Sequence, residues 1–325
     1  MKAKQNFTTG QPSIPNSTYA GEFAGQYIAA ALLSAKTLDN KYVEIHPNVK
    51  FKEVIQKLDV SGIVQNASCD FVTSGSVTLS ERILVPKELQ VNLSLCKQEF
   101  VDSWNAMQLG FSAFDTIPAS FNDYLISYVG GIVAQATEQS IWTGSTSTNG
   151  QFGGFLPAFS ASIAAGGATA VLAAKSGSII ISGSITAANV IDKINSVYQT
   201  IPNAVFGKED LLIYVPSNVA RAYQTALGGN ANQSGFQTQM NVGEKPFNFQ
   251  GIEIVLCPGM ASNSIVAAQK SNLHFGTGLL SDYNEVRVLD MANIDGSQNY
   301  RIIMRYTGGT VFGIGQDIVY YGAYA

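Results

Sequence analysis

Apolar and polar residues alternate with a period of two in the first third of the chain. The clearest stretch is "ELQVNLSLC", in which Leu89, Val91 and Leu93 alternate with polar residues, and "NVKFKEV" and "SVTLS" show the same period. Such alternation is typical of strands with one buried face. We predict a long two-stranded excursion over residues 43–95 with a polar tip. Because an isolated ribbon is marginal in water, we expect it to lie on a neighbouring molecule.

Apolar residues three and four positions apart predict helices over residues 19–38 and 97–109, and most clearly from Ser120 to Trp142. At about 1.5 Å per residue the last of these is roughly 35 Å long. It contains no Lys or Arg, and Gly144 follows as a natural stop.

Gly130 and Gly131 lie together near the middle of this long helix. A glycine in a helix interior costs about 1 kcal/mol relative to alanine, so the pair needs a reason. Two explanations stay open. Either a neighbouring group packs closely over the pair, or the pair is a built-in bend.

The C-terminal half alternates between the two patterns. Helical periods over 186–202 and 217–227 flank the apolar strand "DLLIYVP", and five further strand-like stretches follow the polar loop 228–249. The small-residue stretch 160–191 is interpreted as strands and turns. This mixture predicts an α/β or α+β domain.

The composition indicates a surface with few ions. Of 325 residues, 46% are hydrophobic and only 13% are charged, against about 25% charged residues in typical soluble domains. A neutral polar surface can be buried against copies of itself without desolvating many ions, which favours an assembling protein over the alternative of a monomer. The net charge of −4 argues against a protein that grips nucleic acid through Lys and Arg.

Candidate chemistry is sparse. Cys69, Cys96 and Cys257 have neither metal-binding nor disulfide spacing and are interpreted as free thiols. His46 and His274 have no cysteine or carboxylate at catalytic or metal spacing. No complete phosphate-binding motif, membrane span or secretory signal core is found. The sequence predicts no enzyme, and no catalytic residue, cofactor, metal or membrane partner.

The order of these elements resembles that of the major capsid proteins of tailed bacteriophages, which have the Hong-Kong-ninety-seven-type capsid fold. The stretch "EQSIWTGSTSTNGQFGGFLP" is similar to the end of that family's spine helix and the turn after it, and "NYRIIMRYTGGTVFGIGQDIVYYG" is similar to its closing strands. The resemblance implies an α+β fold with an N-terminal arm, an extended β loop, a peripheral domain with a long spine helix, and an axial domain.

The resemblance also implies boundaries and roles. The boundaries are 1–42 for the arm, 43–97 for the extended loop, 98–185 for the peripheral domain with the spine helix, 186–284 for the axial domain, and 285–325 for the closing strands of the peripheral domain. Six residues are expected to serve structure and assembly: Gly130, Gly131, Trp142, Gly144, Phe155 and Leu156. Trp142 would anchor the helix end, the glycine-rich segment would turn the chain, and Phe155 and Leu156 would pack back.

The implied function is that of a structural protein. Subunits would assemble as pentamers and hexamers into an icosahedral shell around double-stranded DNA, held by weak non-specific contact. Further candidate partners are separate scaffolding, portal and decoration proteins. The implied location is the virion capsid, assembled in the host cytoplasm. Two alternatives stay open: an encapsulin-like cellular compartment of the same fold, and a phage tail-tube or surface-layer protein.

Overall fold

The computed structural model describes residues 35–67, 69, 73–96, 119–177, 179–229, 247–278, 286–291, 296–297 and 299–322. Most of the predicted arm, the predicted helix 97–109 and most of the polar loop 228–249 lie outside these residues. The described elements, in chain order, are α1 (Lys36–Asp39), β1 (Glu44–His46), β2 (Glu53–Ser61), β3 (Ser76–Leu84), β4 (Lys87–Cys96), α3 (Ala119–Thr143), α4 (Phe155–Ala165), β5 (Leu172–Ala173), β6 (Lys175–Ser176), β7 (Ile179–Ile180), α5 (Val190–Thr200), β8 (Leu211–Val215), α6 (Ser217–Gly229), β9 (Phe247–Phe249), β10 (Ile252–Leu256), β11 (Ile265–Gln269), η2 (Lys270–Asn272), β12 (Leu273–Gly276), β13 (Val286–Asp290), β14 (Asn299–Phe312), η5 (Gly315–Asp317) and β15 (Val319–Tyr321).

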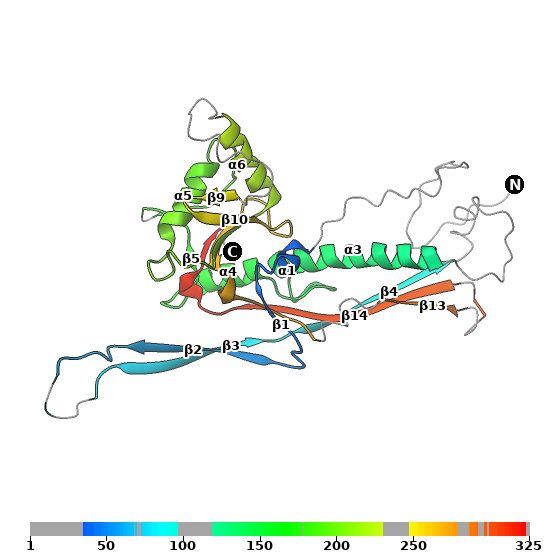
Figure 1. Cartoon of the computed structure of the whole chain (residues 1–325), viewed down its shortest axis with the longest axis horizontal. Helices are drawn as coiled ribbons and strands as arrows, with labels where there is room; N and C mark the ends of the chain where they lie inside the picture. Colours follow the sequence, from blue (N-terminus) through cyan, green and yellow to red (C-terminus); the bar gives the residue numbers. More distant parts are fainter. Residues whose placement is uncertain are drawn as a thin grey trace.

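Three parts are visible in Figure 1. A compact lobe holds α5, α6 and the strands beside them. The long helix α3 extends from the lobe alongside β4 and β14. The ribbon of β2 and β3 projects in the opposite direction, past the lobe. The chain thus combines a globular centre with two elongated extensions.

The ribbon is shorter than the sequence predicts. β2 and β3 pair antiparallel from Glu53↔Leu84 to Ser61↔Ser76. β1 instead pairs with β12, and β4 pairs with β14 along its whole length. The prediction of one excursion over residues 43–95 is wrong at both ends, because alternation shows that a segment is a strand without showing which strand it pairs with.

The strands of two larger sheets alternate along the chain, so neither sheet is formed by one continuous segment. The five-stranded sheet has the order β1-β12-β14-β13, with β4 also paired to β14, and the six-stranded sheet has the order β5-β15-β11-β8-β10-β9. β12 lies in the range predicted as axial, and β15 lies in the range predicted to close the peripheral domain. Each joins the other sheet, so the sheets do not divide at the predicted boundary between residues 284 and 285. Long-range strand pairing decides sheet membership, and a local period does not encode it.

The six-stranded sheet is buried on both faces. All five residues of β8 are buried. Ile213 and Val215 pack in the core beneath α5 and α6, while Leu212 and Tyr214 pack in a second core that contains the end of α3 and α4. The uninterrupted apolar run "LLIYV" is the expected sequence for such a central strand.

The interpretation of residues 160–191 as strands and turns is wrong for the first part of this stretch, which belongs to helix α4. Its buried residues Phe155, Leu156 and Phe159 lie on one face of the helix. Pro157 falls in the first helical turn, where its missing N–H costs nothing. The Ala residues that follow have high helical propensity, which the strand interpretation overlooked. Within the described residues, no helix combines the length and apolarity needed to cross a bilayer.

The core under α5 yields a stability prediction. Ile194 is fully buried against the six-stranded sheet, whereas Ile180 in β7 is half exposed. Ile194→Ala is expected to lower the free energy of unfolding by about 2–5 kcal/mol, through lost burial and the cavity left behind. Ile180→Ala is the matched control and should cost much less. Chemical denaturation of both variants tests the difference, and equal losses would contradict the assignment of this core.

Candidate functional site

The end of α3 lies in a buried aromatic junction. Ile141 and Trp142 are completely buried. The Trp142 ring lies with its centroid 5.5 Å from that of Phe155 and 5.3 Å from that of Tyr214. The helix end is thereby packed between α4 and the six-stranded sheet, which joins the long helix to the compact lobe.

A buried hydrogen-bond network ties the segment before β1 to the same helix end. The Trp142 indole N–H donates to Thr37 Oγ1 at 2.9 Å. Thr37 in turn donates from its hydroxyl to Glu138 Oε1 at 2.6 Å and from its backbone N–H to Glu138 Oε2 at 3.0 Å. All three side chains are buried, so the network satisfies groups that would otherwise be costly to remove from water.

Burial raises the pKa of the Glu138 carboxyl above its ordinary value. Hydrogen bonds from Thr37 and from the backbone of Gly259 act in the opposite direction, and burial has the larger effect. Glu138 was not among the residues predicted from the sequence to form this junction. The available signal was a single acidic residue within the last apolar turns of an otherwise weakly charged helix.

Glycines allow other backbone segments to contact the last turns of α3 directly. A Cβ on Gly144 would lie 2.5 Å from Ser140 O and would also collide with Phe152 O. A Cβ on Gly154 would lie 2.7 Å from Gly144 N. Gly259, which the sequence did not single out, lies against the backbone of Glu138. Contacts of this kind exclude any side chain, so they explain why glycine stands at positions 144, 154 and 259.

The predicted structural residues fall into two places. Trp142, Gly144, Phe155 and Leu156 meet at the junction, where Phe155 and Leu156 are buried at the start of α4. Gly130 and Gly131 lie further back along α3, which continues through both as helix. Apart from its chain neighbours and the adjacent backbone of α3, no group in the described chain lies within 4 Å of a Cβ built on Gly130. Close packing inside the described subunit therefore does not account for Gly130.

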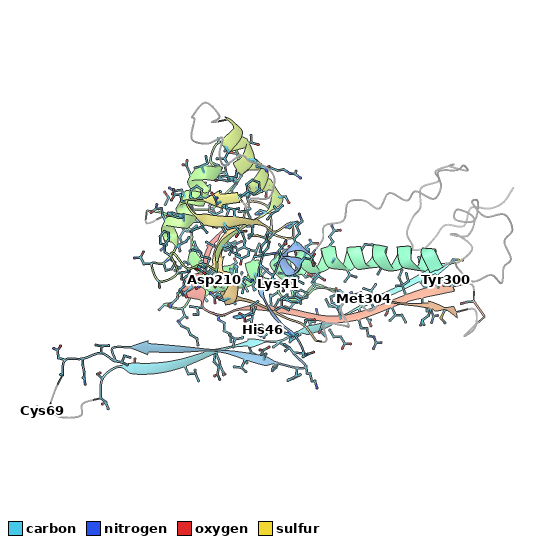
Figure 2. All side chains as sticks on the ribbon, viewed as in Figure 1. Lys41, His46, Cys69, Asp210, Tyr300 and Met304 are labelled. Carbon is cyan, nitrogen blue, oxygen red and sulfur yellow. The ribbon has the colours of Figure 1, made fainter. Side chains whose placement is uncertain are left out.

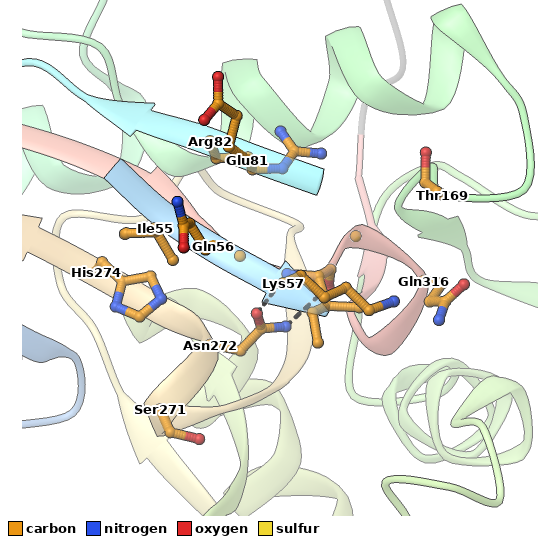
Figure 3. A pocket seen from close by; sticks show the side chains of 13 residues that line it. Ile55, Gln56, Lys57, Glu81, Arg82, Thr169, Ser271, Asn272, His274 and Gln316 are labelled. Atoms are coloured by element: carbon orange, nitrogen blue, oxygen red, sulfur yellow. Dashed lines mark hydrogen bonds between the residues drawn. The ribbon is translucent and has the colours of Figure 1, made fainter. Parts of the chain in front are cut away.

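A cavity of about 620 Å³ separates the ribbon from the body. Figure 3 shows Lys57 and Gln56 of β2 on one side and Asn272 and His274 on the other. Arg82 of β3 stacks over the Phe312 ring at 3.9 Å, a cation–π contact that holds the ribbon on β14. This contact and the strand pairings place the root of the ribbon on the five-stranded sheet.

The two histidines meet beside this cavity. His46 Nε2 lies 3.0 Å from His274 Nδ1, and His46 Nδ1 lies 2.9 Å from Glu53 Oε1. Glu44 Oε2 lies 3.7 Å from His274 Nδ1. Burial and the neighbouring His46 lower the pKa of His274, against smaller opposing effects of the two carboxylates. Spacing in the sequence could not reveal this cluster, because its histidines are 228 residues apart.

Solved structures with the same arrangement of elements are available for comparison. The chain is 14% identical to the capsid chain of an empty GTA particle, with 96% of this chain and 94% of that chain covered and a TM-score of 0.57. The chain is 11% identical to the capsid of Myoviridae phage XM1, with 90% of this chain and 93% of that chain covered and a TM-score of 0.56. It is also 11% identical to a chain of Gordonia phage Cozz, with 99% of this chain and 100% of that chain covered and a TM-score of 0.56. No family profile and no curated protein matches the sequence.

The chain has the capsid fold of tailed bacteriophages. The likeness covers nearly the whole chain, so the predicted Hong-Kong-ninety-seven-type α+β fold is confirmed. At identities this low the shared property is the path of the backbone.

The glycine contacts generate a matched pair of substitutions. Gly144→Ala is expected to lower the free energy of unfolding by about 1–3 kcal/mol, because the new methyl group meets backbone that cannot move aside. Gly130→Ala should instead raise it by up to about 1 kcal/mol, since the position is open and alanine favours helix. Thermal and chemical unfolding of the two variants test the opposite signs.

Glu138 generates a prediction about pH. Because its folded pKa is raised above the ordinary value of 4.5, its contribution to stability is fully present below that value and is lost as pH rises through the folded pKa. Glu138→Gln does not titrate there, and its amide NH₂ opposes one Thr37 donor, which adds a constant penalty. The free energy of unfolding of the wild type, relative to this variant, should fall as pH increases above about 4.5. Parallel pH profiles would contradict the prediction.

Proposed function

We propose that the chain is the major capsid subunit of a tailed-phage-like particle and acts as a structural protein rather than an enzyme. The observation that carries the proposal is the capsid fold over nearly the whole chain, shared with the capsid chains of a GTA particle and a myovirus. The particle structure solved with fivefold symmetry supports self-assembly as the mode of action. Pentamers and hexamers of this subunit would close into an icosahedral shell.

The ribbon supports this proposal as a contact between subunits. Its apolar side chains are exposed although they lie in paired strands: Leu79 is 62% exposed, and Val54 and Ile83 are each 47% exposed. Beyond the last pair, Val64 is 91% exposed. Figure 2 shows the ribbon extending from His46 near its root to Cys69 at its far end. Apolar surface carried so far from the body gains burial only against another molecule.

The net charge of the chain is compatible with a shell that encloses DNA without binding it tightly. A net charge of −4 provides little neutralisation of phosphate, so packaged double-stranded DNA would be held by weak, non-specific contacts. We place the subunit in the virion capsid, assembled in the host cytoplasm, with scaffolding, portal and decoration proteins as further partners. In this assignment α3 is the spine helix, β2 and β3 form the extended loop, and the six-stranded sheet with α5 and α6 forms the axial part.

Gly130 and Gly131 would then give the spine helix a soft point. Two adjacent glycines weaken a helix locally, and glycine pairs are among the recognised origins of kinks. The open space beside Gly130 supports a bend over close packing. We propose that the helix bends here in a precursor shell and straightens in the mature one.

A shortened ribbon tests the proposed function. Replacing Leu58–Leu79 with Asn-Gly leaves the register from Glu53↔Leu84 to Lys57↔Ser80 intact and closes the hairpin with a favoured two-residue turn. The variant should fold with unchanged circular dichroism and remain as unassembled subunits, while the wild type forms closed shells in electron micrographs. Shells of normal size from the variant would contradict the role of the ribbon. Wild-type tubes or sheets, or shells that hold a protein cargo in place of DNA after phage production, would contradict the capsid assignment.

A further inference from the structure

The only two histidines of the 325-residue chain lie in contact with each other. They come from different segments, His46 from β1 and His274 from β12, and these strands are paired in parallel with Glu44 opposite His274. The register therefore brings the Glu44 carboxylate to the same place. One ligand atom from each of these three residues lies within 4.8 Å of the other two.

The donor set and spacing match those of a zinc site. Tetrahedral Zn²⁺ with bonds of 2.0–2.1 Å places two imidazole nitrogens about 3.3 Å apart, and His46 Nε2 and His274 Nδ1 lie 3.0 Å apart. The two rings are nearly edge to face, with an interplanar angle of 67°, so their nitrogens converge on one region without stacking. Glu44 is half exposed, which gives its carboxylate freedom to move toward the metal.

Glu53 supplies the support that such a ligand requires. Its carboxylate lies 2.9 Å from His46 Nδ1, so Nδ1 donates its proton there and Nε2 is left as the lone-pair nitrogen facing His274. A carboxylate on the far nitrogen fixes the tautomer and orientation of a metal-ligating histidine and increases its basicity. Glu53 is also the first residue of β2, so it connects the cluster to the root of the ribbon.

We propose that Glu44, His46 and His274 bind a divalent transition metal ion such as Zn²⁺, with water in the fourth position and Glu53 as the orienting carboxylate. The ion would join β1 to β12 and, through Glu53, fix the first residue of the ribbon against the body. This inference does not depend on the proposed capsid function, since metal binding is measured on the isolated subunit.

A metal-free arrangement of the same residues makes a different prediction. His274 Nδ1–H can donate to His46 Nε2 while His46 Nδ1–H donates to Glu53, which forms a hydrogen-bonded chain without an ion. In that arrangement Glu44 has no essential role, and Zn²⁺ has no reason to bind at this place. The two arrangements therefore differ in metal stoichiometry and in the effect of Glu44.

The test uses the purified full-length chain in a Cys69→Ser, Cys96→Ser background, which removes the two cysteines that are not fully buried. Calorimetric titration with Zn²⁺ should give one ion per subunit. His46→Gln and His274→Gln should each abolish this binding, and Glu44→Gln should weaken it at least tenfold. Glu53→Gln is expected to weaken it by about 10–100-fold. The matched control Glu88→Gln, an exposed carboxylate on β4, should bind as the parent does.

A second measurement does not depend on the variants folding. Co²⁺ added to the parent chain should produce the visible absorption of a tetrahedral site and should be displaced by one equivalent of Zn²⁺. The ring signals of both histidines should shift together in NMR spectra when Zn²⁺ is added. No binding at micromolar Zn²⁺, or binding that the histidine substitutions leave unchanged, would overturn the proposal in favour of the metal-free arrangement.

Discussion

The fold depends on direct contact between backbones at the end of the long helix. Gly144, Gly154 and Gly259 each come so close to the last turns of α3 that no side chain fits between. This closeness brings Trp142 within reach of Thr37 and Phe155, and so joins three separate segments of chain. Because α3 has 25 residues, a small rotation at its packed C-terminal end would displace its N-terminal end by a much larger distance. Close packing at the C-terminal end of α3 therefore fixes the direction of the helix axis relative to the lobe.

The six-stranded sheet is the second organising element, because it carries a core on each face. The side chains of β8 alternate between the two cores, so a change on one face is transmitted through a single strand to the other. The order of β12 and β15 strengthens this connection. The chain leaves the six-stranded sheet after β11, forms β12 and β14 in the five-stranded sheet, and returns to the six-stranded sheet as β15. The chain therefore passes between the two sheets more than once, and no single point in the sequence separates the lobe from the elongated sheet.

Local patterns in the sequence were sufficient to predict some elements and not others. The long helix was predicted as Ser120–Trp142 and observed as Ala119–Thr143, because its apolar period is continuous and Gly144 ends it. α4 was missed because it is short and its end runs into a Gly- and Ser-rich stretch, a composition that is typical of turns. The meeting of His46 with His274, and of Thr37 with Glu138 and Trp142, depends on strand pairing and helix packing over more than 100 residues. No spacing rule carries that information, so these contacts needed the three-dimensional structure.

The pairing of β4 with β14 has a mechanical consequence. β4 follows the ribbon after only two residues, Val85 and Pro86, and then runs antiparallel to β14 from Lys87 to Cys96. A pull on the ribbon reaches β4 along its axis, whereas the hydrogen bonds to β14 lie across that axis. The ladder is therefore loaded in shear, with its bonds sharing the force at once, instead of opening one at a time as in a peeled hairpin. The fold therefore resists tension on the ribbon most strongly in the direction in which the ribbon itself extends.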